Sequence, residues 1–408
     1  MEQGPAIEGN LWRFQAFAAV VFTPFMLPVL VLFWQDNGLD LFDVFALQGL
    51  FAVAVVLLEV PTGMIADRLG KRTSLSIAAV VLAISMLGYA LGHGFSAFLA
   101  AEIGLALGVA LYSGADAALL FDTLEALDRK AEYQRLSGRI RAIQMISIAL
   151  ANIAGGIVGS WSLRATLWMS ILGPVLAFVV ARGFVEVQKP EVAETPRAAL
   201  KAYGALIASA TKFVRKHRLV QWQIALMAVL VGSATWLLWL YQPYMQMVGL
   251  PIWAFGVAFA IFNGWAALLS TLAHRFDGWF GELGTVVVLM VLQILPLIGM
   301  ALWIHPASWL LILGHQSVRG VVRTVISERI LRHTYADKRS TVLSMASLAA
   351  RFFFAATAPV IGLASRALTL PEALLIQAAL LTVVFGGLLI SYGRIDPKYF
   401  RIKKQDSE

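Results

Sequence analysis

The sequence contains no cysteine, and charged residues make up only 14% of its 408 positions. Without cysteine the chain forms no disulfide and no thiolate metal or redox site. The low charge argues against a soluble domain, where about 25% of residues are charged. The chain also lacks a G-x-x-x-x-G-K-[ST] phosphate loop, an H-E-x-x-H motif and a G-x-S-x-G motif. We therefore expect no ATP hydrolysis, no other enzyme activity, no metal and no cofactor.

Apolar residues are abundant instead: 59% of the chain is hydrophobic, and the mean hydropathy is +0.77. A hydrocarbon core about 30 Å thick needs about 20 apolar residues at 1.5 Å each, so long uncharged runs predict membrane-spanning helices. We predict an all-α polytopic membrane protein with twelve spans, at residues 12–34, 43–64, 73–93, 96–127, 139–160, 165–183, 220–242, 252–273, 284–304, 307–332, 340–364 and 372–392.

Basic residues are distributed unevenly between the two sides of this topology. The segments on the side of both termini carry 27 Lys and Arg, and the opposite loops carry only Arg164 and Arg366. The positive-inside rule makes the basic side cytoplasmic. We expect both termini in the cytoplasm, a multi-pass protein of the cell (inner) membrane, and a monomer. The net charge of +8 then reflects loops facing an anionic leaflet, so no nucleic-acid partner is expected.

The chain divides into two similar halves. The sequence IAGGIVG at 153–159 aligns with ATAPVIG at 356–362, and IADRLG at 65–70 has a degenerate counterpart, LAHRFDG at 272–278. We predict two pseudo-symmetric six-helix bundles, 1–183 and 220–392, with a cytoplasmic central loop at 184–219 and a cytoplasmic tail at 393–408. Within the central loop, residues 197–220 form either an amphipathic helix on the membrane or a plain linker.

A dense charge cluster, GMIADRLGKR, occupies residues 63–72 between the second and third spans. Any cytoplasmic loop attracts basic residues, but this does not explain Asp67 or the glycine spacing. We expect Gly63 to allow close helix approach and Gly70 a tight turn. The pattern G-x-x-x-D-R-x-G-K-R, preceded by LEVPTG, resembles the signature loop of the major facilitator superfamily, and LYSGADAALLFDTL in span four is similar to its drug-efflux-like and uncharacterised bacterial members.

The resemblance implies an inner-gate latch between the two halves. The aspartate of this loop, here Asp67, is expected to meet the start of span eleven near Ser340, where a helix N-terminus favours a carboxylate. A basic residue of the loop is expected to pair with Asp122 at the end of span four, but which one stays open, because Lys71 lacks the bidentate fork of arginine. The gating residues expected are Gly63, Asp67, Arg68, Gly70, Lys71, Arg72, Asp122 and Glu59.

Ionisable residues inside spans cost about 2.5–3.5 kcal/mol each on insertion scales and therefore mark functional candidates. Asp116 in span four aligns with Arg319 in span ten, and His315, Arg319 and Arg323 are spaced by four residues along one helix face. We expect this stripe to face a water-filled cavity. Either Arg319 and Arg351 bind an anionic substrate while Asp116 carries a proton or balances them, or Asp116 pairs with an arginine and holds the halves together.

Two further residues complete the candidate set for substrate binding or proton coupling. Glu102 is either a proton carrier or an interfacial residue near the outer end of span four, and Trp236 is a candidate wall of an aromatic pocket. We expect proton-coupled efflux of an amphipathic or anionic small molecule by alternating access. The alternatives are uptake of an organic anion by the same fold, and a transporter-like receptor or scaffold without flux. Span five has GGIVG but lacks the Gly-Pro motif of many antiporters, so the direction stays open.

Overall fold

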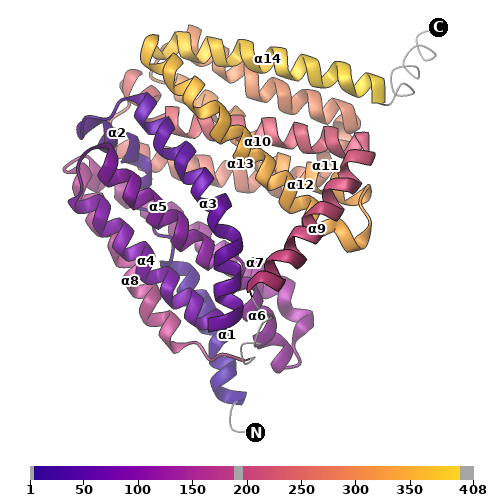
Figure 1. Ribbon diagram of the computed structural model, residues 1–408. Helices are drawn as coiled ribbons and strands as arrows, with labels where there is room; N and C mark the ends of the chain where they lie inside the picture. The colour runs from indigo at the N-terminus through magenta and orange to yellow at the C-terminus, as the bar shows by residue number, and fades with distance from the viewer. Residues whose placement is uncertain (1–3, 188–195, 396–408) are drawn as a thin grey trace. The chain divides into compact units, whose positions relative to one another are not determined.

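The computed structural model describes residues 4–187 and 196–395, and in this part of the chain all regular structure is helical (Figure 1). The elements are α1 (Gly4–Val20), η1 (Leu27–Val29), α2 (Leu30–Asp36), α3 (Leu41–Leu69), α4 (Lys71–Leu91), α5 (Gly94–Tyr112), α6 (Ala115–Ala126), η2 (Lys130–Glu132), α7 (Tyr133–Gly159), α8 (Leu163–Gly183), α9 (Pro196–Lys216), α10 (Arg218–Met247), α11 (Ile252–Leu302), η3 (Ser308–Leu311), α12 (Ile312–Arg332), η4 (Ala336–Lys338), α13 (Arg339–Ala367) and α14 (Leu370–Ile395).

These helices account for the twelve predicted spans. Among the described residues, nine helices are long and apolar enough to cross a membrane. One of them, α11, has 51 residues and turns at Gly281 (φ 70°, ψ 169°), so it contains two spans. The other two spans are α12, which carries several charges, and the segment formed by α1, η1 and α2. The twelve-helix fold is confirmed.

Two spans that the sequence presented as continuous are interrupted. The first is divided between α1 and α2, and the fourth is divided between α5 and α6. Gly114 causes the second break: its φ of 87° lies in the left-handed region, which side chains other than glycine rarely adopt. The C-terminus of α5 and the N-terminus of α6 therefore meet inside a membrane span, close to Asp116.

The chain folds as two compact units. Unit 1 comprises Met1–Leu200 with Met245–Asn263, and unit 2 comprises Lys201–Tyr244 with Gly264–Glu408. In unit 1, α4 packs against both α5 and α8, and α3 packs against α5 (Figure 1). Its core is built mainly from leucine and phenylalanine side chains of α1, α4 and α6, among them Phe14, Phe17, Leu75, Leu119 and Leu124.

Close helix contacts in unit 2 depend on small residues. A Cβ at Gly320 of α12 would lie 2.4 Å from the Ala266 carbonyl oxygen on α11, so only glycine fits at this crossing. A Cβ at Gly232 of α10 would lie 2.5 Å from the Phe353 ring on α13. Helices that approach this closely gain van der Waals contact where lipid supplies no hydrophobic driving force.

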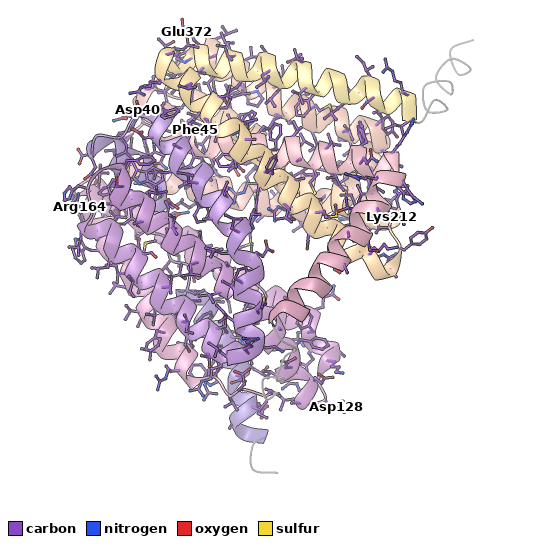
Figure 2. The ribbon with its side chains drawn as sticks, viewed as in Figure 1. Asp40, Phe45, Asp128, Arg164, Lys212 and Glu372 are labelled. Carbon is purple, nitrogen blue, oxygen red and sulfur yellow. The ribbon has the colours of Figure 1, made fainter. Side chains whose placement is uncertain are left out.

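The central segment contains a helix, α9, as one of the two sequence interpretations expected. Near its end, Phe213 is 6% exposed, stacks on His217 at 4.1 Å and meets Tyr335 edge to face at 5.6 Å, both between ring centroids. The Lys338 ammonium lies 5.7 Å from the Phe213 ring. Lys212 of the same helix is exposed (Figure 2). The C-terminal end of α9 is thus anchored to the loop that contains η4, whereas residues 188–195 of the predicted central loop and residues 396–408 of the predicted tail lie outside the described residues.

Candidate functional site

The turn between α3 and α4 is held by charged side chains of unit 1. Gly70 ends α3 with φ 90° and ψ 153°, as the expected tight turn requires. The Lys71 and Arg72 backbone N–H groups then donate to the two carboxylate oxygens of Glu186, at 3.0 and 2.8 Å. Glu186 thereby satisfies unpaired N–H groups at the start of α4, where the helix dipole also favours a negative charge.

Lys71 is the basic partner of Asp122. The Lys71 ammonium forms an ion pair with the Asp122 carboxylate at the end of α6, and the two side chains are 23% and 8% exposed. The Arg72 guanidinium instead donates to the Arg182 carbonyl oxygen at 2.7 Å. The pair links the turn after α3 to α6 through a lysine point charge, without the bidentate fork of an arginine.

Other predicted gating residues show fewer contacts. Gly63, where close helix approach was expected, has nothing within 4 Å of a Cβ position in the described structure. Glu59 and Arg68 are exposed. The side chain of Asp67 lies outside the described residues, so its expected meeting with the start of span eleven stays a prediction. The residue that sequence reasoning missed is Glu186, and its signal was an acid just beyond the end of span six.

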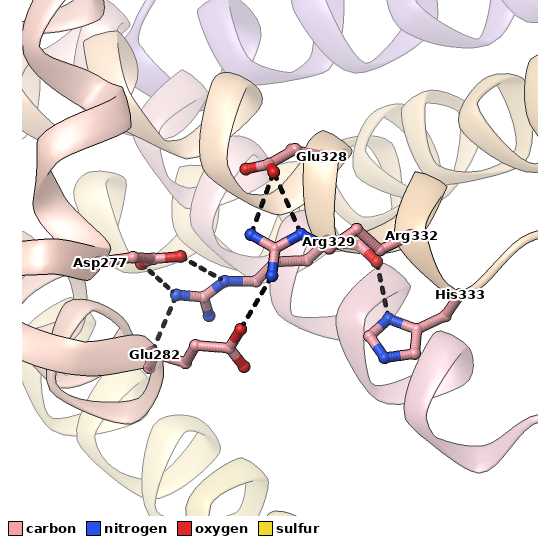
Figure 3. Close-up of polar contacts among 6 residues, drawn as sticks. All are labelled: Asp277, Glu282, Glu328, Arg329, Arg332 and His333. Atoms are coloured by element: carbon pink, nitrogen blue, oxygen red, sulfur yellow. Dashed lines mark hydrogen bonds and ion pairs between the residues drawn. The ribbon is translucent and has the colours of Figure 1, made fainter.

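Unit 2 contains a similar turn, at Gly281 inside α11, and Figure 3 shows the polar contacts of charged side chains from this region. The Arg329 guanidinium of α12 is 5% exposed and binds the Asp277 carboxylate through Nε at 3.3 Å and Nη2 at 2.5 Å. Glu282, directly after the glycine, accepts from Arg332 Nη1 at 3.1 Å. This turn follows the degenerate repeat at 272–278, in which His274 aligns with Asp67, but the acid that forms the ion pair here is Asp277.

A pocket of about 140 Å³ opens beside this second turn. Its wall includes Trp222 and Gln223 of α10, Arg329 of α12 and Tyr392 of α14. The Gln223 side chain is 3% exposed, and its Oε1 has no hydrogen-bond partner in the described structure. The pocket is small compared with sites for drug-sized ligands, which occupy about 300–1,000 Å³.

Asp116 belongs to a polar cluster at the break between α5 and α6. The Tyr112 hydroxyl lies beside the Asp116 and Gln144 side chains, and the charge of Arg141 acts on it. Arg141 Nη1 donates to Gln144 Oε1 at 2.7 Å. Sequence reasoning counted Arg141 among the cytoplasmic basic residues, although it lies inside the predicted fifth span. Broken helices often build binding sites in transporters, because their ends expose backbone dipoles inside the membrane.

Glu102 is buried inside unit 1 and is not interfacial. It is 3% exposed, and its Oε1 accepts a hydrogen bond from Gln48 Nε2 at 2.7 Å and one from the Tyr89 hydroxyl at 2.5 Å. The partners come from α3 and α4, which pack against α5. The interfacial interpretation of Glu102 is therefore wrong for this structure.

The polar stripe on α12 is not one uniform face. His315 is 1% exposed, contacts the Gln293 carbonyl oxygen through Nε2 at 3.0 Å and stacks parallel to the Tyr241 ring at 6.5 Å. Arg319 and Arg323 are exposed. Arg319 Nη1 donates to Gln316 Oε1 at 3.2 Å. His315 thus departs from the expectation that the stripe faces a cavity, because its ring packs between α10 and α11.

Arg351 and Trp236 have opposite environments in unit 2. Arg351 of α13 is exposed in the middle of an apolar helix, and the described structure records no hydrogen bond or ion pair for it. Trp236 is 0% exposed, donates to Thr357 Oγ1 at 3.0 Å and stacks on Phe353 at 5.5 Å. Trp236 is therefore a core residue, and the prediction that it lines a pocket is wrong for this structure.

The first turns of α11 pack tightly on α7 within unit 1. A Cβ at Gly156 would lie 2.6 Å from the Gly256 nitrogen and 2.7 Å from the Trp253 carbonyl oxygen. A Cβ at Gly256 would lie 2.2 Å from the Asn152 carbonyl oxygen. The glycine-rich stretch of span five is thus used for a contact in which two backbones touch.

Solved structures of transporters share this fold. The nucleoside transporter NupG superposes with a TM-score of 0.76 at 13% identity, covering 96% of this chain and 99% of that one. A bacterial homologue of the human lysosomal transporter Spinster, in an inward-facing and unoccupied conformation, superposes with a TM-score of 0.73 at 15% identity, covering 96% and 98%. At these identities the likeness shows the fold alone.

Sequence comparison gives one named relative over part of the chain. The quinolone resistance protein NorA of Staphylococcus aureus is 23% identical over 156 residues, which are 38% of this chain and 39% of NorA. The match thus spans about two-fifths of the relative's length. Residues 14–359, most of the chain, match the sequence pattern of the Major Facilitator Superfamily. The chain belongs to the Major Facilitator Superfamily.

Proposed function

We propose that this secondary transporter exports an amphipathic or anionic small molecule across the cell membrane in exchange for protons. The observation that carries the proposal is the exposure of Arg351, Arg319 and Arg323 in unit 2. A guanidinium inside a span is costly in lipid, so exposed ones require a water-filled or ligand-filled space. Since α12 and α13 pack against each other, the arginines offer donors from two adjacent helices to one anionic group.

The direction of transport is supported by the partial similarity to NorA, whose name describes drug resistance. Both termini lie in the cytoplasm in this proposal, because the basic residues gather on their side.

In this orientation the loop at residues 63–72 lies on the cytoplasmic side, where Asp67 holds the inner side of the transporter closed in one state. We expect Asp67→Asn to reduce substrate flux in a transport assay. Size-exclusion chromatography should show the same amount of folded protein as in the wild type. Flux equal to that of the wild type would contradict a gating role for Asp67.

Transport in proteoliposomes tests the substrate class and the direction. Purified protein is challenged with a panel of organic anions, a zwitterionic fluoroquinolone, lipophilic cations and neutral sugars, each with and without a pH gradient. We expect flux of anions that grows with the gradient and is lost in Arg351→Gln. Flux of cations alone contradicts the anion assignment and makes Asp116 the substrate contact.

The second candidate function is uptake of an organic anion through the same arginines. The exposed guanidinium groups favour it as strongly as they favour efflux. Flux in which anion and proton move in the same direction supports uptake, and opposite directions support efflux. Binding without flux by any member of the panel supports a receptor.

A further inference from the structure

The carboxyl group of Glu102 is enclosed by aromatic and amide side chains in unit 1. Tyr89 stacks on Phe98 at 5.4 Å between ring centroids and lies 6.3 Å from the Trp34 ring. Tyr89, Trp34 and Phe98 are all 0% exposed. Gln48, from α3, is 5% exposed. Four elements, α2, α3, α4 and α5, therefore contribute to a cage around one titratable group.

No cation neutralises this carboxyl among the described residues. Charged groups near the starts of α3 and α8 have other partners. Arg164 donates to the Ala90 carbonyl oxygen at 2.7 Å and to Asn37 Oδ1 at 2.7 Å, and it is labelled in Figure 2. Asp40 and Asp43 form a reciprocal cap at the start of α3. On α4 and α5 the only titratable group that meets Glu102 is Tyr89.

A carboxylate buried without a cation is costly, and such groups avoid the cost by taking up a proton. Donors to a carboxyl oxygen stabilise the charged form as well, so burial without a cation is what favours the proton here, and the hydrogen bonds bear on its position. Both donors, Gln48 Nε2 and the Tyr89 hydroxyl, meet the same oxygen, Oε1. In a carboxylic acid the carbonyl oxygen accepts such bonds, and the other oxygen carries the proton. In the protonated group these two bonds make Oε1 the carbonyl oxygen, which leaves Oε2 to carry the proton.

We propose that Glu102 is a proton-binding site of unit 1, protonated at Oε2 in this conformation. The step is the transfer of one proton between water and Oε2, with no other bond made or broken. Tyr89 and Gln48 are positioning residues that hold the neutral acid. In the transport cycle Oε2 exchanges its proton with water while the cage is open and keeps the proton while the cage is closed. This coupling role rests on the proposed proton exchange, whereas the protonation itself does not.

Infrared difference spectroscopy tests the protonation without any transport. The carbonyl stretch of a protonated carboxylic acid is well separated from carboxylate bands and shifts in D₂O. At neutral pH we expect this band in the wild type and not in Glu102→Gln, which keeps the shape of the side chain. Glu372→Gln is the matched control, because Glu372 is exposed and its carboxylate is held by Thr369. A spectrum with no difference between wild type and Glu102→Gln overturns the proposal.

A second variant tests the assignment of the two oxygens. Tyr89→Phe removes one hydrogen bond to Oε1 and leaves the aromatic ring in place. If Oε1 is the carbonyl oxygen, the carbonyl band moves to higher frequency. An unmoved band, with the protein folded as judged by size-exclusion chromatography, contradicts the placement of the proton on Oε2.

Transport separates this proposal from the proposed function. In Glu102→Gln we expect substrate exchange without a gradient to continue, while accumulation driven by a pH gradient falls at least tenfold. Full gradient-driven accumulation in the variant overturns the coupling role of Glu102. If substrate accumulation by the wild-type protein does not depend on the pH gradient but its infrared band is present, proton-coupled efflux is contradicted. Glu102 is then a protonated site without a coupling role.

Discussion

Lys71 and Glu282 each follow a glycine with positive φ, and each pairs with a residue of opposite charge on a neighbouring helix. Their environments differ. Asp122, the partner of Lys71, is 8% exposed, whereas Glu282 and its partner Arg332 are 46% and 48% exposed. Exposed ion pairs contribute about 0–1 kcal/mol to stability. Removing one partner of a buried pair costs about 3–5 kcal/mol, because the other charge stays desolvated.

This contrast predicts unequal effects of two similar substitutions. Asp122→Asn should lower the free energy of unfolding by about 2–3 kcal/mol, since Lys71 is only partly buried. Glu282→Gln, the control, should change it by less than about 1 kcal/mol. Thermal unfolding in detergent measures both. Lys71→Met combined with Asp122→Asn should recover part of the lost stability. Equal losses in Asp122→Asn and Glu282→Gln would contradict the idea that burial makes the Lys71–Asp122 pair more important for stability.

Arg351 should act on ligand binding and not on folding. A charged hydrogen bond contributes about 1.5–3 kcal/mol, so Arg351→Gln should weaken binding of a transported anion about tenfold to a hundredfold. Isothermal titration of purified protein measures the affinity. Arg366→Gln is the matched control, because Arg366 is an exposed arginine at the end of the same helix. Equal affinities of the wild type, Arg351→Gln and Arg366→Gln for the anion would exclude Arg351 from the binding site.

At this scale the sequence located charges but not their contacts. It placed Glu102, Asp116 and Arg351 inside spans, because ionisable residues stand out in apolar runs. The resemblance led us to expect a basic residue of the loop to pair with Asp122, but it left open which one, and the structure shows Lys71. Glu186 was not expected, because it contacts the Lys71 backbone from 115 positions away. The sequence also could not show that Trp236 is a core residue, because its indole N–H donates a hydrogen bond to Thr357 on another helix.

The helices of this chain end and bend at glycines that no other residue replaces without strain. Gly70 has φ 90°, and a Cβ there would also lie 2.9 Å from Glu186 Oε2. Gly281 divides α11 in the same way, with φ 70°. The turn between paired spans is therefore encoded twice, by one glycine in each unit.

Gly70→Ala should destabilise the protein by about 1–2 kcal/mol from backbone strain, with a further loss if Glu186 is displaced from the start of α4. Gly138→Ala is the control. Gly138 is helical with nothing within 4 Å of a Cβ, so alanine there should stabilise by about 0.5–1 kcal/mol. Thermal unfolding compares the two variants. Stabilisation by Gly70→Ala would show that the turn relaxes without cost.

The sequence predicted the number of helices well and their continuity less well. Apolar runs define spans because lipid requires every backbone group to be bonded inside the helix. The break at Gly114 was not predicted, since a single glycine in an apolar run can lie within a continuous helix or at the end of one. The break brings Tyr112 of α5 close to Asp116 of α6.

At the scale of the whole molecule, the absence of cysteine makes the topology easy to test. Gln134 and Ser160, on opposite ends of α7, are exposed. In intact cells we expect a membrane-impermeant maleimide to label Ser160→Cys and not Gln134→Cys, because the positive-inside rule places Gln134 in the cytoplasm. Permeabilised cells, where both variants should react, provide the control. The reverse pattern in intact cells would invert the proposed orientation.

The sequence by itself determined the twelve helices and the transporter family, and it predicted which side carries the basic loops. These properties follow from local composition: apolar length sets the spans, and the spacing of GMIADRLGKR identifies the signature loop. The tertiary structure decided which charges meet and which stay exposed. It gave Glu102 its two donors on one oxygen, placed Trp236 in the core and left Arg351 without a partner among the described residues. Such contacts join residues far apart in the chain, and only the packing of one helix on another brings them within bonding distance.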